Sequence, residues 1–213
     1  MKYTHILWDF NGTLLDDVGC GITCINTMLK KRGLPTIDSV EKYHSVFTFP
    51  ITQYYENVGF DFEKEPFSKI APEWIELNQI NIKKAPLFDD AITVLEELKR
   101  KKISQAIISA TKQDLLRGHI ADIGITDYFD DISGLDNINA ESKIGIAENW
   151  VKNNPEAKTV LIGDTVHDFE VSSAVNIDCL LVCRGHQSKQ TLTKTGMPVF
   201  DTLTCVLEYL TTQ

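Results

Sequence analysis

Short apolar runs that alternate with amphipathic helical segments constrain the fold of this chain more than any other feature. The apolar runs cover residues 6–8, 103–108, 159–162 and 179–182, with a shorter candidate strand or turn at 132–134. Helical patterns lie at residues 89–98, 113–123, 143–152, 169–175 and 203–210. Strands that alternate with helices form a parallel sheet whose two faces are both covered. The pattern therefore predicts an α/β fold with a doubly wound parallel sheet.

The segment from Asp16 to Ala85 departs from this alternation, because nothing in it reads convincingly as a strand. Its apolar residues follow helical spacing at 16–32, 38–45, 51–58 and 67–84. We expect residues 1–15 and 86–213 to form the α/β core and residues 16–85 to form an inserted α-helical cap. The insert leaves the core just after the first strand, which places it over the edge where that strand ends.

Polar residues stand where the predicted strands end. They are Asp9 with Thr13, Ser109, the turn before Lys143, and Asp164 with Asp168. In a parallel sheet these strand ends lie on one edge, so the side chains can converge. Carboxylates that converge repel one another unless they share a cation, and oxygen ligands of this kind favour Mg²⁺. The sequence therefore predicts an acidic magnesium site at this edge.

The same edge offers groups that bind phosphate. Ser109 or Thr111, followed by a helix N-terminus, can hold phosphate oxygens through hydroxyl and backbone N–H groups. Lys143 can neutralise the remaining charge. Together these residues predict attack on a phosphoryl group, with Asp9 as the covalent nucleophile.

These motifs resemble those of the haloacid dehalogenase superfamily, mostly Mg²⁺-dependent phosphohydrolases, over nearly the whole chain. Asp9-Phe10-Asn11-Gly12-Thr13 is similar to the family motif D-x-D-x-T, and Gly163-Asp164-Thr165-Val166-His167-Asp168 fits its G-D-x-x-x-D motif. Ser109 looks like the hydroxyl motif, and Lys143 in Ala140-Glu141-Ser142-Lys143 looks like the lysine motif. The helical insert corresponds to the small cap of phosphoglycolate-phosphatase-like and β-phosphoglucomutase-like members. The order of the four motifs carries the resemblance.

The resemblance implies a role for each of these residues. The catalytic residues would be Asp9, Asn11, Ser109 and Lys143. The Mg²⁺ ligands would be Asp9, the Asn11 backbone carbonyl, Asp164 and Asp168, the last directly or through water. The phosphoryl group would be held by Asp9, Thr13, Ser109, Ala110 and Lys143.

Asn11 departs from the family pattern, because phosphatases of the family carry an aspartate there as general acid/base. A carboxamide can neither protonate a leaving alkoxide nor activate water, and the loss of a general acid/base typically costs about 10²–10⁴ in rate. Three explanations compete: a substrate with a good leaving group, a substitute group such as His167 or His44, or slow turnover in a protein that chiefly binds its ligand.

Other polar and aromatic residues have simpler interpretations. Asp16-Asp17 could add metal ligands, although capping or loop roles are the default for such residues. One residue of Arg184-Gly185-His186 could reach the site, because this segment directly follows a strand. Aromatic residues at 47, 49, 54 and 55 could line the substrate face of the cap or pack within it.

The net charge and the composition of the chain disfavour several classes of binding partner. The formal net charge is −9, which disfavours a nucleic-acid backbone or an anionic membrane. No apolar run approaches the roughly 18–20 residues of a membrane helix, and the start is too short for a signal peptide. The five cysteines lack the usual C-x₂-C spacing of a zinc site, so reduced thiols in a cytoplasmic protein are the better interpretation.

We therefore expect a Mg²⁺-dependent phosphatase of a small phosphorylated metabolite, phosphoglycolate-phosphatase-like, that works through a phospho-aspartyl intermediate. The main alternative is a slow or non-catalytic phosphate-ligand-binding protein on the same scaffold. A phosphoacceptor receiver module is disfavoured by the inserted helices. A dinucleotide-binding dehydrogenase is disfavoured because no G-x-G-x-x-G follows the first strand.

Overall fold

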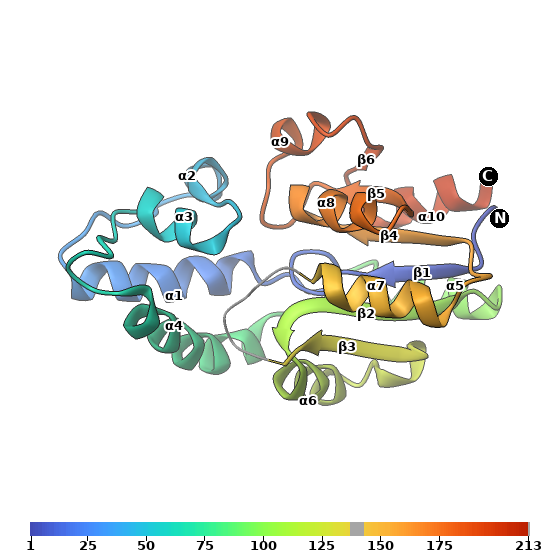
Figure 1. The fold of residues 1–213 in the computed structure, drawn as a ribbon, viewed down its shortest axis with the longest axis horizontal. Coiled ribbons are helices and arrows are strands. Elements are labelled where there is room, and N and C mark those ends of the chain that lie inside the picture. The colour runs from blue at the N-terminus through green and yellow to red at the C-terminus, as the bar shows by residue number, and fades with distance from the viewer. Residues whose placement is uncertain (137–142, 213) are drawn as a thin grey trace.

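A parallel β-sheet forms the centre of the molecule in the computed structural model, which describes residues 1–136 and 143–212. Within these residues the sheet has six strands in the order β3-β2-β1-β4-β5-β6, and all the strand pairs are parallel (Figure 1). The strands are β1 (His5–Trp8), β2 (Ser104–Lys112), β3 (Asp131–Leu135), β4 (Thr159–Gly163), β5 (Asp178–Val182) and β6 (Val199–Phe200). The predicted α/β fold with a parallel sheet is confirmed.

Helices cover both faces of the sheet because successive strand residues point to opposite sides. Ile6 and Trp8 of β1 pack into one apolar cluster with α5 (Ala91–Arg100), α6 (Gln113–Ile123) and α10 (Leu203–Thr212). Leu7, between them, packs into a second cluster with α7 (Ile144–Asn153), α8 (Val166–Ala174) and α9 (Lys189–Thr193). The sheet is therefore doubly wound, and its strands are apolar on both faces.

Beyond shifts of one or two residues at element ends, the elements differ from the sequence-based expectation as follows. β2 does not stop at Ser109 but continues to Lys112, with an irregular register against β3 beyond Ile108. α8 begins at Val166, because Thr165 caps it there, rather than at residue 169. The short elements α9 and β6 were not expected, since five and two residues are too few for a periodic pattern.

The insert between β1 and α5 consists of helices packed on one another. They are α1 (Val18–Lys31), α2 (Val40–Val46), α3 (Ile51–Asn57) and α4 (Phe67–Asn81), with a 3₁₀ turn at Ile82–Lys84. Met28, Tyr43, Tyr55 and Ile70 belong to an apolar cluster of their own, separate from the two clusters of the sheet. Figure 1 shows these helices together beyond the arrowheads of the strands. The division into units 16–85 and the remainder stays a prediction.

An ion-pair network joins α1 to α4 within the insert. The Arg32 guanidinium bonds Glu65 through Nε (2.7 Å to Oε2) and Glu73 through Nη2 (2.7 Å to Oε2). The Glu73 side chain is only 20% exposed, and its hydrogen bond to Arg32 holds the pKa of its carboxyl below the usual 4.5. A lowered pKa means that the ionised form stabilises the fold.

We expect Glu73→Gln to lower the free energy of unfolding by about 1 kcal/mol at pH 7. Because the folded-state pKa is depressed, this contribution is complete above pH 4.5 and is lost as the pH falls through the folded-state value. Urea unfolding of both proteins between neutral and acidic pH measures it, with Glu76→Gln, an exposed site on α4, as control. A difference that persists unchanged in acid would mean that packing, rather than the ion pair, is lost.

None of the helices in the described residues has the length and apolar character needed to cross a membrane.

Candidate active site

Three buried carboxylates and one buried lysine meet at the carboxyl ends of β1 and β4. One oxygen from each of Asp9, Asp164 and Asp168 lies within 4.8 Å of the others. Lys143, at the start of α7, forms an ion pair with Asp9 and another with Asp168 (2.6 Å from Nζ to Oδ1). The four side chains are almost completely buried, so their charges interact with little screening by water.

The electrostatics of this cluster favour a cation. Burial raises the pKa of Asp9, and the neighbouring carboxylates raise it further against the opposing effect of Lys143. Burial also raises the pKa of Asp164. Burial also acts to raise the pKa of Asp168, but Lys143 and Thr165 outweigh it, so this pKa lies below its usual value. A divalent cation would supply the charge that three carboxylates and one ammonium lack, and the all-oxygen donor set fits Mg²⁺.

Two glycines let the backbone pass close to the Asp164 carboxylate. Gly12 has a left-handed backbone (φ 72°), and a Cβ there would overlap the Asp164 carboxylate. A Cβ at Gly185 would overlap Asp164 Oδ2, the same oxygen that a Cβ at Gly12 would meet. The close approach lets the backbone N–H of His186 donate to Asp164 Oδ2 (2.6 Å), and the Thr13 hydroxyl donates to Oδ1 (3.2 Å). The carboxylate of Asp164 is thereby held in one orientation.

Asp168 is oriented by a capping box at the start of α8. Its Oδ2 accepts hydrogen bonds from the backbone N–H of Thr165 (2.9 Å), from the Thr165 hydroxyl (2.7 Å) and from the backbone N–H of Asp164 (3.1 Å). Its other oxygen faces Lys143. This geometry suits Asp168 to positioning Lys143.

We expect Thr165→Ala to lower the free energy of unfolding by about 1 kcal/mol and to lower activity as well, because Asp168 loses a donor. Ser188→Ala is the matched control, since Ser188 caps α9 in the same way through the backbone N–H of Thr191. Thermal unfolding and phosphate release measured on both variants separate the two effects. Equal activity losses in the two variants would contradict a specific role for Thr165.

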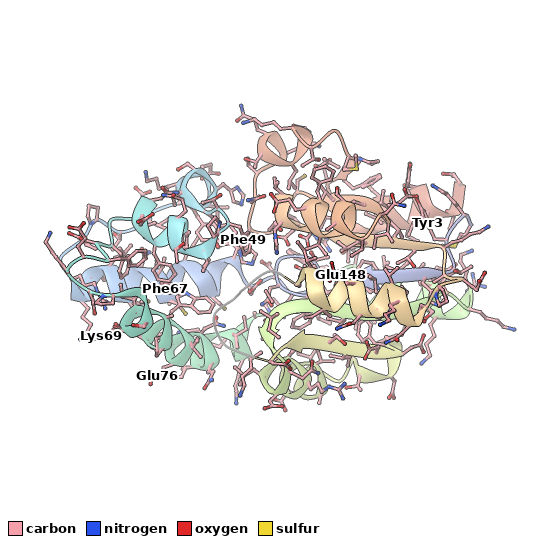
Figure 2. The ribbon with its side chains drawn as sticks, viewed as in Figure 1. Tyr3, Phe49, Phe67, Lys69, Glu76 and Glu148 are labelled. Carbon is pink, nitrogen blue, oxygen red and sulfur yellow. The ribbon has the colours of Figure 1, made fainter. Side chains whose placement is uncertain are left out.

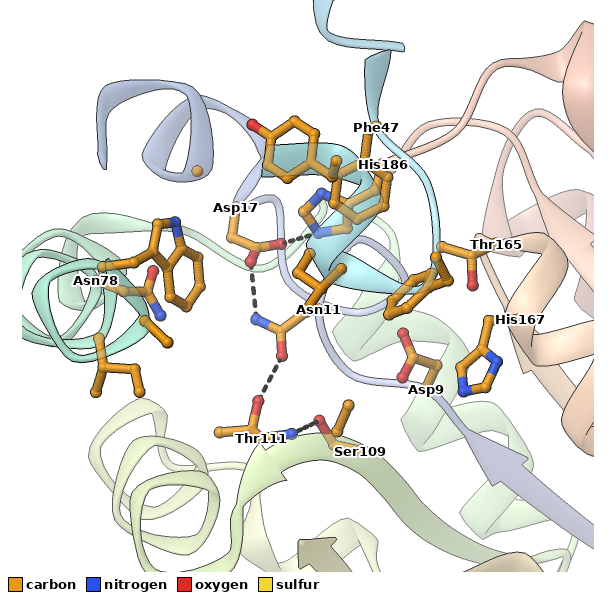
Figure 3. Close-up of a pocket in the computed structure, with 18 of the residues that line it drawn as sticks. Asp9, Asn11, Asp17, Phe47, Asn78, Ser109, Thr111, Thr165, His167 and His186 are labelled. Atoms are coloured by element: carbon orange, nitrogen blue, oxygen red, sulfur yellow. Dashed lines mark hydrogen bonds and ion pairs between the residues drawn. The ribbon is translucent and has the colours of Figure 1, made fainter. Parts of the chain in front are cut away.

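A chain of hydrogen bonds links the β2 end of the site to the insert (Figure 3). The backbone N–H of Thr111 donates to Ser109 Oγ (3.1 Å), and the Thr111 hydroxyl donates to Asn11 Oδ1 (3.0 Å). Asn11 Nδ2 then donates to Asp17 Oδ2 (2.8 Å), and Asp17 Oδ1 lies 3.3 Å from His186 Nε2. Both polar atoms of the Asn11 side chain are therefore engaged by neighbouring residues.

His186 connects this chain to the insert. The Tyr43 hydroxyl and His186 Nδ1 lie 2.8 Å apart, and the Phe47 ring stacks on the imidazole with ring centroids 5.1 Å apart. Burial disfavours charge on His186, but the Asp17 carboxylate outweighs it and raises the pKa of the imidazole to about 9. The protonated ring therefore compensates the charge of Asp17.

The structure brings most of the predicted site residues to one cavity. Its lining includes Asp9, Asn11, Ser109, Ala110, Lys143 and Asp164. Thr13 and Asp168 do not line it; they are buried beside it and contact Asp164 and Lys143. Residues 140–142 of the lysine motif lie outside the described residues. The catalytic, phosphate-binding and metal-binding roles stay predictions.

Of the histidines and the arginine considered from the sequence, some line the cavity and others do not. His167 lines the cavity, with Nδ1 3.1 Å from Glu170 Oε2, and its Nε2 has no hydrogen-bond partner among the described residues. His44 instead lies 2.9 Å from the Gly185 carbonyl oxygen. Arg184 points away, with its guanidinium 3.9 Å from the centre of the Phe88 ring.

Asp17 has a role that sequence reasoning left open. Its side chain does not cap α1; it accepts from Asn11 and from the backbone N–H of Gly12 (2.8 Å). Neither Asp16 nor Asp17 belongs to the group of clustered carboxylates. The signal in the sequence was only its closeness to Asn11, because its partner His186 lies near the other end of the chain.

Comparison with known proteins places the chain in a family. The family model for haloacid dehalogenase-like hydrolases matches residues 6–182. The chain belongs to the haloacid dehalogenase-like hydrolase family. The resemblance inferred from the four motifs is therefore confirmed, and with it the expectation of a hydrolase.

Solved structures share the whole fold of this haloacid dehalogenase-like chain. A haloacid dehalogenase-like hydrolase from Streptococcus pneumoniae superposes with a TM-score of 0.83 at 21% identity, covering 98% of this chain and 99% of the other. A predicted phosphatase from Clostridium acetobutylicum gives 0.79 at 17% identity, with 99% of each chain covered. A predicted phosphoglycolate phosphatase from Haemophilus somnus gives 0.77 at 15% identity, again over 99% of each chain. No curated protein sequence matches the chain.

Proposed function

We propose that this protein is a Mg²⁺-dependent phosphatase of small phosphorylated metabolites that acts through a phosphorylated Asp9. The observation that carries the proposal is the buried Asp9 carboxylate. It pairs with Lys143 and lies beside Asp164 at the carboxyl ends of β1 and β4. A cytoplasmic location is part of the proposal, and no nucleic-acid or membrane partner is expected.

The proposed chemistry assigns one task to each group. Asp9 attacks phosphorus, the bond to the ester oxygen breaks, and water then cleaves the aspartyl phosphate to release inorganic phosphate. Lys143, Ser109 and the backbone at Ala110 hold the phosphoryl oxygens. Asp9, Asp164 and the backbone carbonyl of Asn11 would hold the Mg²⁺, which neutralises charge on the phosphoryl group.

Asp168 supports this arrangement without a separate chemical step. It orients Lys143 and is itself fixed by Thr165. Asp17 has a comparable role at the other side, because it holds the Asn11 side chain and the backbone at Gly12. Both assignments are proposals that follow from these contacts.

Phosphate release from a panel of phosphate esters and one acyl phosphate, measured with Mg²⁺ and again with excess EDTA, tests the proposal. The panel includes 2-phosphoglycolate, the substrate class suggested by the resemblance, together with phenyl and acetyl phosphate. We expect release that requires Mg²⁺. Saturable binding of inorganic phosphate in Mg²⁺ without release from any ester would instead indicate a binding protein.

A further inference from the structure

The cavity beside Asp9 has an apolar wall that the insert provides. Its volume is about 210 Å³, and most side chains from the insert are apolar or aromatic, among them Phe47, Phe49, Tyr54, Phe67, Trp74 and Ile75. Asn78 and Gln79 add uncharged polar groups to the same wall. Figure 2 shows Phe49 on the side of the insert that faces the core, and Phe67 inside it. An engineered apolar cavity of about 150 Å³ in another protein binds benzene, so this one has room for an aromatic ring.

Positive charge is confined to the core side of this cavity. Among the lining residues within the described part of the chain, the basic side chains are Lys112, Lys143, His167 and His186, and the charged residue of the insert is Asp17. Lys143 is committed to Asp9 and Asp168, and His186 to Asp17. Lys112 lies 3.6 Å from Asp114, and His167 Nδ1 lies 3.1 Å from Glu170. Within the described residues the insert contributes no basic side chain to the lining. A substrate carboxylate placed against the insert would therefore lose its hydration without gaining a cation from that wall, which is costly.

The Asn11 amide restricts the leaving group in an independent way. Its oxygen accepts from Thr111 and its nitrogen donates to Asp17, and an amide has no proton to transfer to a departing oxygen. An ester whose oxygen leaves as a stable anion needs little proton transfer, so it tolerates this site better than an alkyl ester does.

From these two observations we infer that the substrate is a phosphate monoester whose organic part is uncharged and aromatic, with a phenol-type oxygen attached to phosphorus. Asp9 forms a bond to phosphorus, and the bond from phosphorus to the aryl oxygen breaks. The phenolate departs with the electron pair and takes its proton from water. This inference rests on the proposed function and names the substrate class for the same site.

Benzyl phosphate, 2-phosphoglycolate and phenyl phosphate together distinguish the effect of the apolar wall from the effect of the leaving group. Benzyl phosphate and 2-phosphoglycolate both release a primary alcohol, so their comparison tests the apolar wall. We expect kcat/KM to be about 100-fold higher for benzyl phosphate, since burial of a phenyl group is worth roughly that factor. Phenyl phosphate against benzyl phosphate tests the leaving group, and we expect phenyl phosphate to react faster through kcat.

Variants of α4 test whether the wall itself is responsible. Trp74→Ala should raise KM for benzyl phosphate about tenfold and leave acetyl phosphate unchanged, while Glu76→Ala, on the outer side of the same helix (Figure 2), should change neither. Ile75→Arg, which adds a cation to the wall, should lower kcat/KM for benzyl phosphate and raise it for 2-phosphoglycolate. This second variant keeps the test decisive if Trp74→Ala fails to fold.

The outcomes distinguish this inference from the proposed function. Release of phosphate from 2-phosphoglycolate at a kcat/KM equal to or above that of benzyl phosphate would overturn the substrate class alone. Equal effects of Trp74→Ala on benzyl and acetyl phosphate would also overturn it. Failure to release phosphate from all of the esters and from acetyl phosphate would overturn the proposed function and the inference with it.

Discussion

Asp9→Asn is expected to lower kcat for every phosphate ester by at least about 10⁴-fold, because the amide cannot form the covalent bond to phosphorus. The fold should persist, since the substitution preserves shape and Lys143 keeps its ion pair with Asp168. Single-turnover phosphate release and circular dichroism measure the two effects.

The matched control for this variant is Asp127→Asn, an exposed position in the 3₁₀ turn Thr126–Tyr128 before β3 begins, at the opposite edge of the parallel sheet from the cluster. It should retain full activity. Turnover that survives Asp9→Asn at more than a tenth of the original rate would contradict a covalent role for Asp9. In that case water would have to attack phosphorus directly.

Asn11→Asp is expected to raise kcat for alkyl esters such as benzyl phosphate by about 10²-fold, because it restores a general acid. The gain should be smaller for phenyl phosphate, whose leaving group needs less help. The new carboxyl would face Asp17 Oδ2, which lies 2.8 Å from the present amide nitrogen. Two carboxyl groups so close share a proton, which raises the pKa of one of them and keeps it protonated near neutral pH.

Asn11→Asp should also lower the free energy of unfolding by about 1–3 kcal/mol, because the hydrogen bond from the Asn11 amide to Asp17 is lost. The double variant Asn11→Asp/Asp17→Asn should recover this stability, since the pair then again contains one donor and one acceptor. Asn153→Asp, an exposed position, is the control for charge. An unchanged or lower rate in a stable double variant would indicate that another group, His167 for example, already supplies the proton or that the chemistry differs.

Much of the sheet was predictable from the sequence, because each core strand is a short apolar run bounded by helical periodicity. β1 and β4 carry this signal, and Asp9 and Asp164 mark their ends by interrupting it. β2 was predicted too short, since Ser109, Thr111 and Lys112 are polar, yet the strand continues and Lys112 pairs with Leu135 of β3. α9 and β6 escaped prediction because their stability comes from contacts with the sheet.

The chain of contacts through Asn11 was not predictable in the same way. The sequence shows that Asn11 stands where the family has an acid, but not that its amide bridges Thr111 and Asp17. The partner of Asp17 is His186, which follows β5 and comes close only because the parallel sheet brings its strand ends to one edge. Such pairs leave no periodic signal in the sequence.

The sequence by itself determined the alternation of strands and helices, the family, and the carboxylates at the strand ends, because each of these depends on residues that are close together in the chain. Only the tertiary structure decided which side chains hold Asn11. It alone also decided that the wall facing Asp9 is largely aromatic and that, among the described residues, the insert adds no basic side chain to it. Those features depend on how the insert packs against the core. A change of packing would alter them without changing any local pattern.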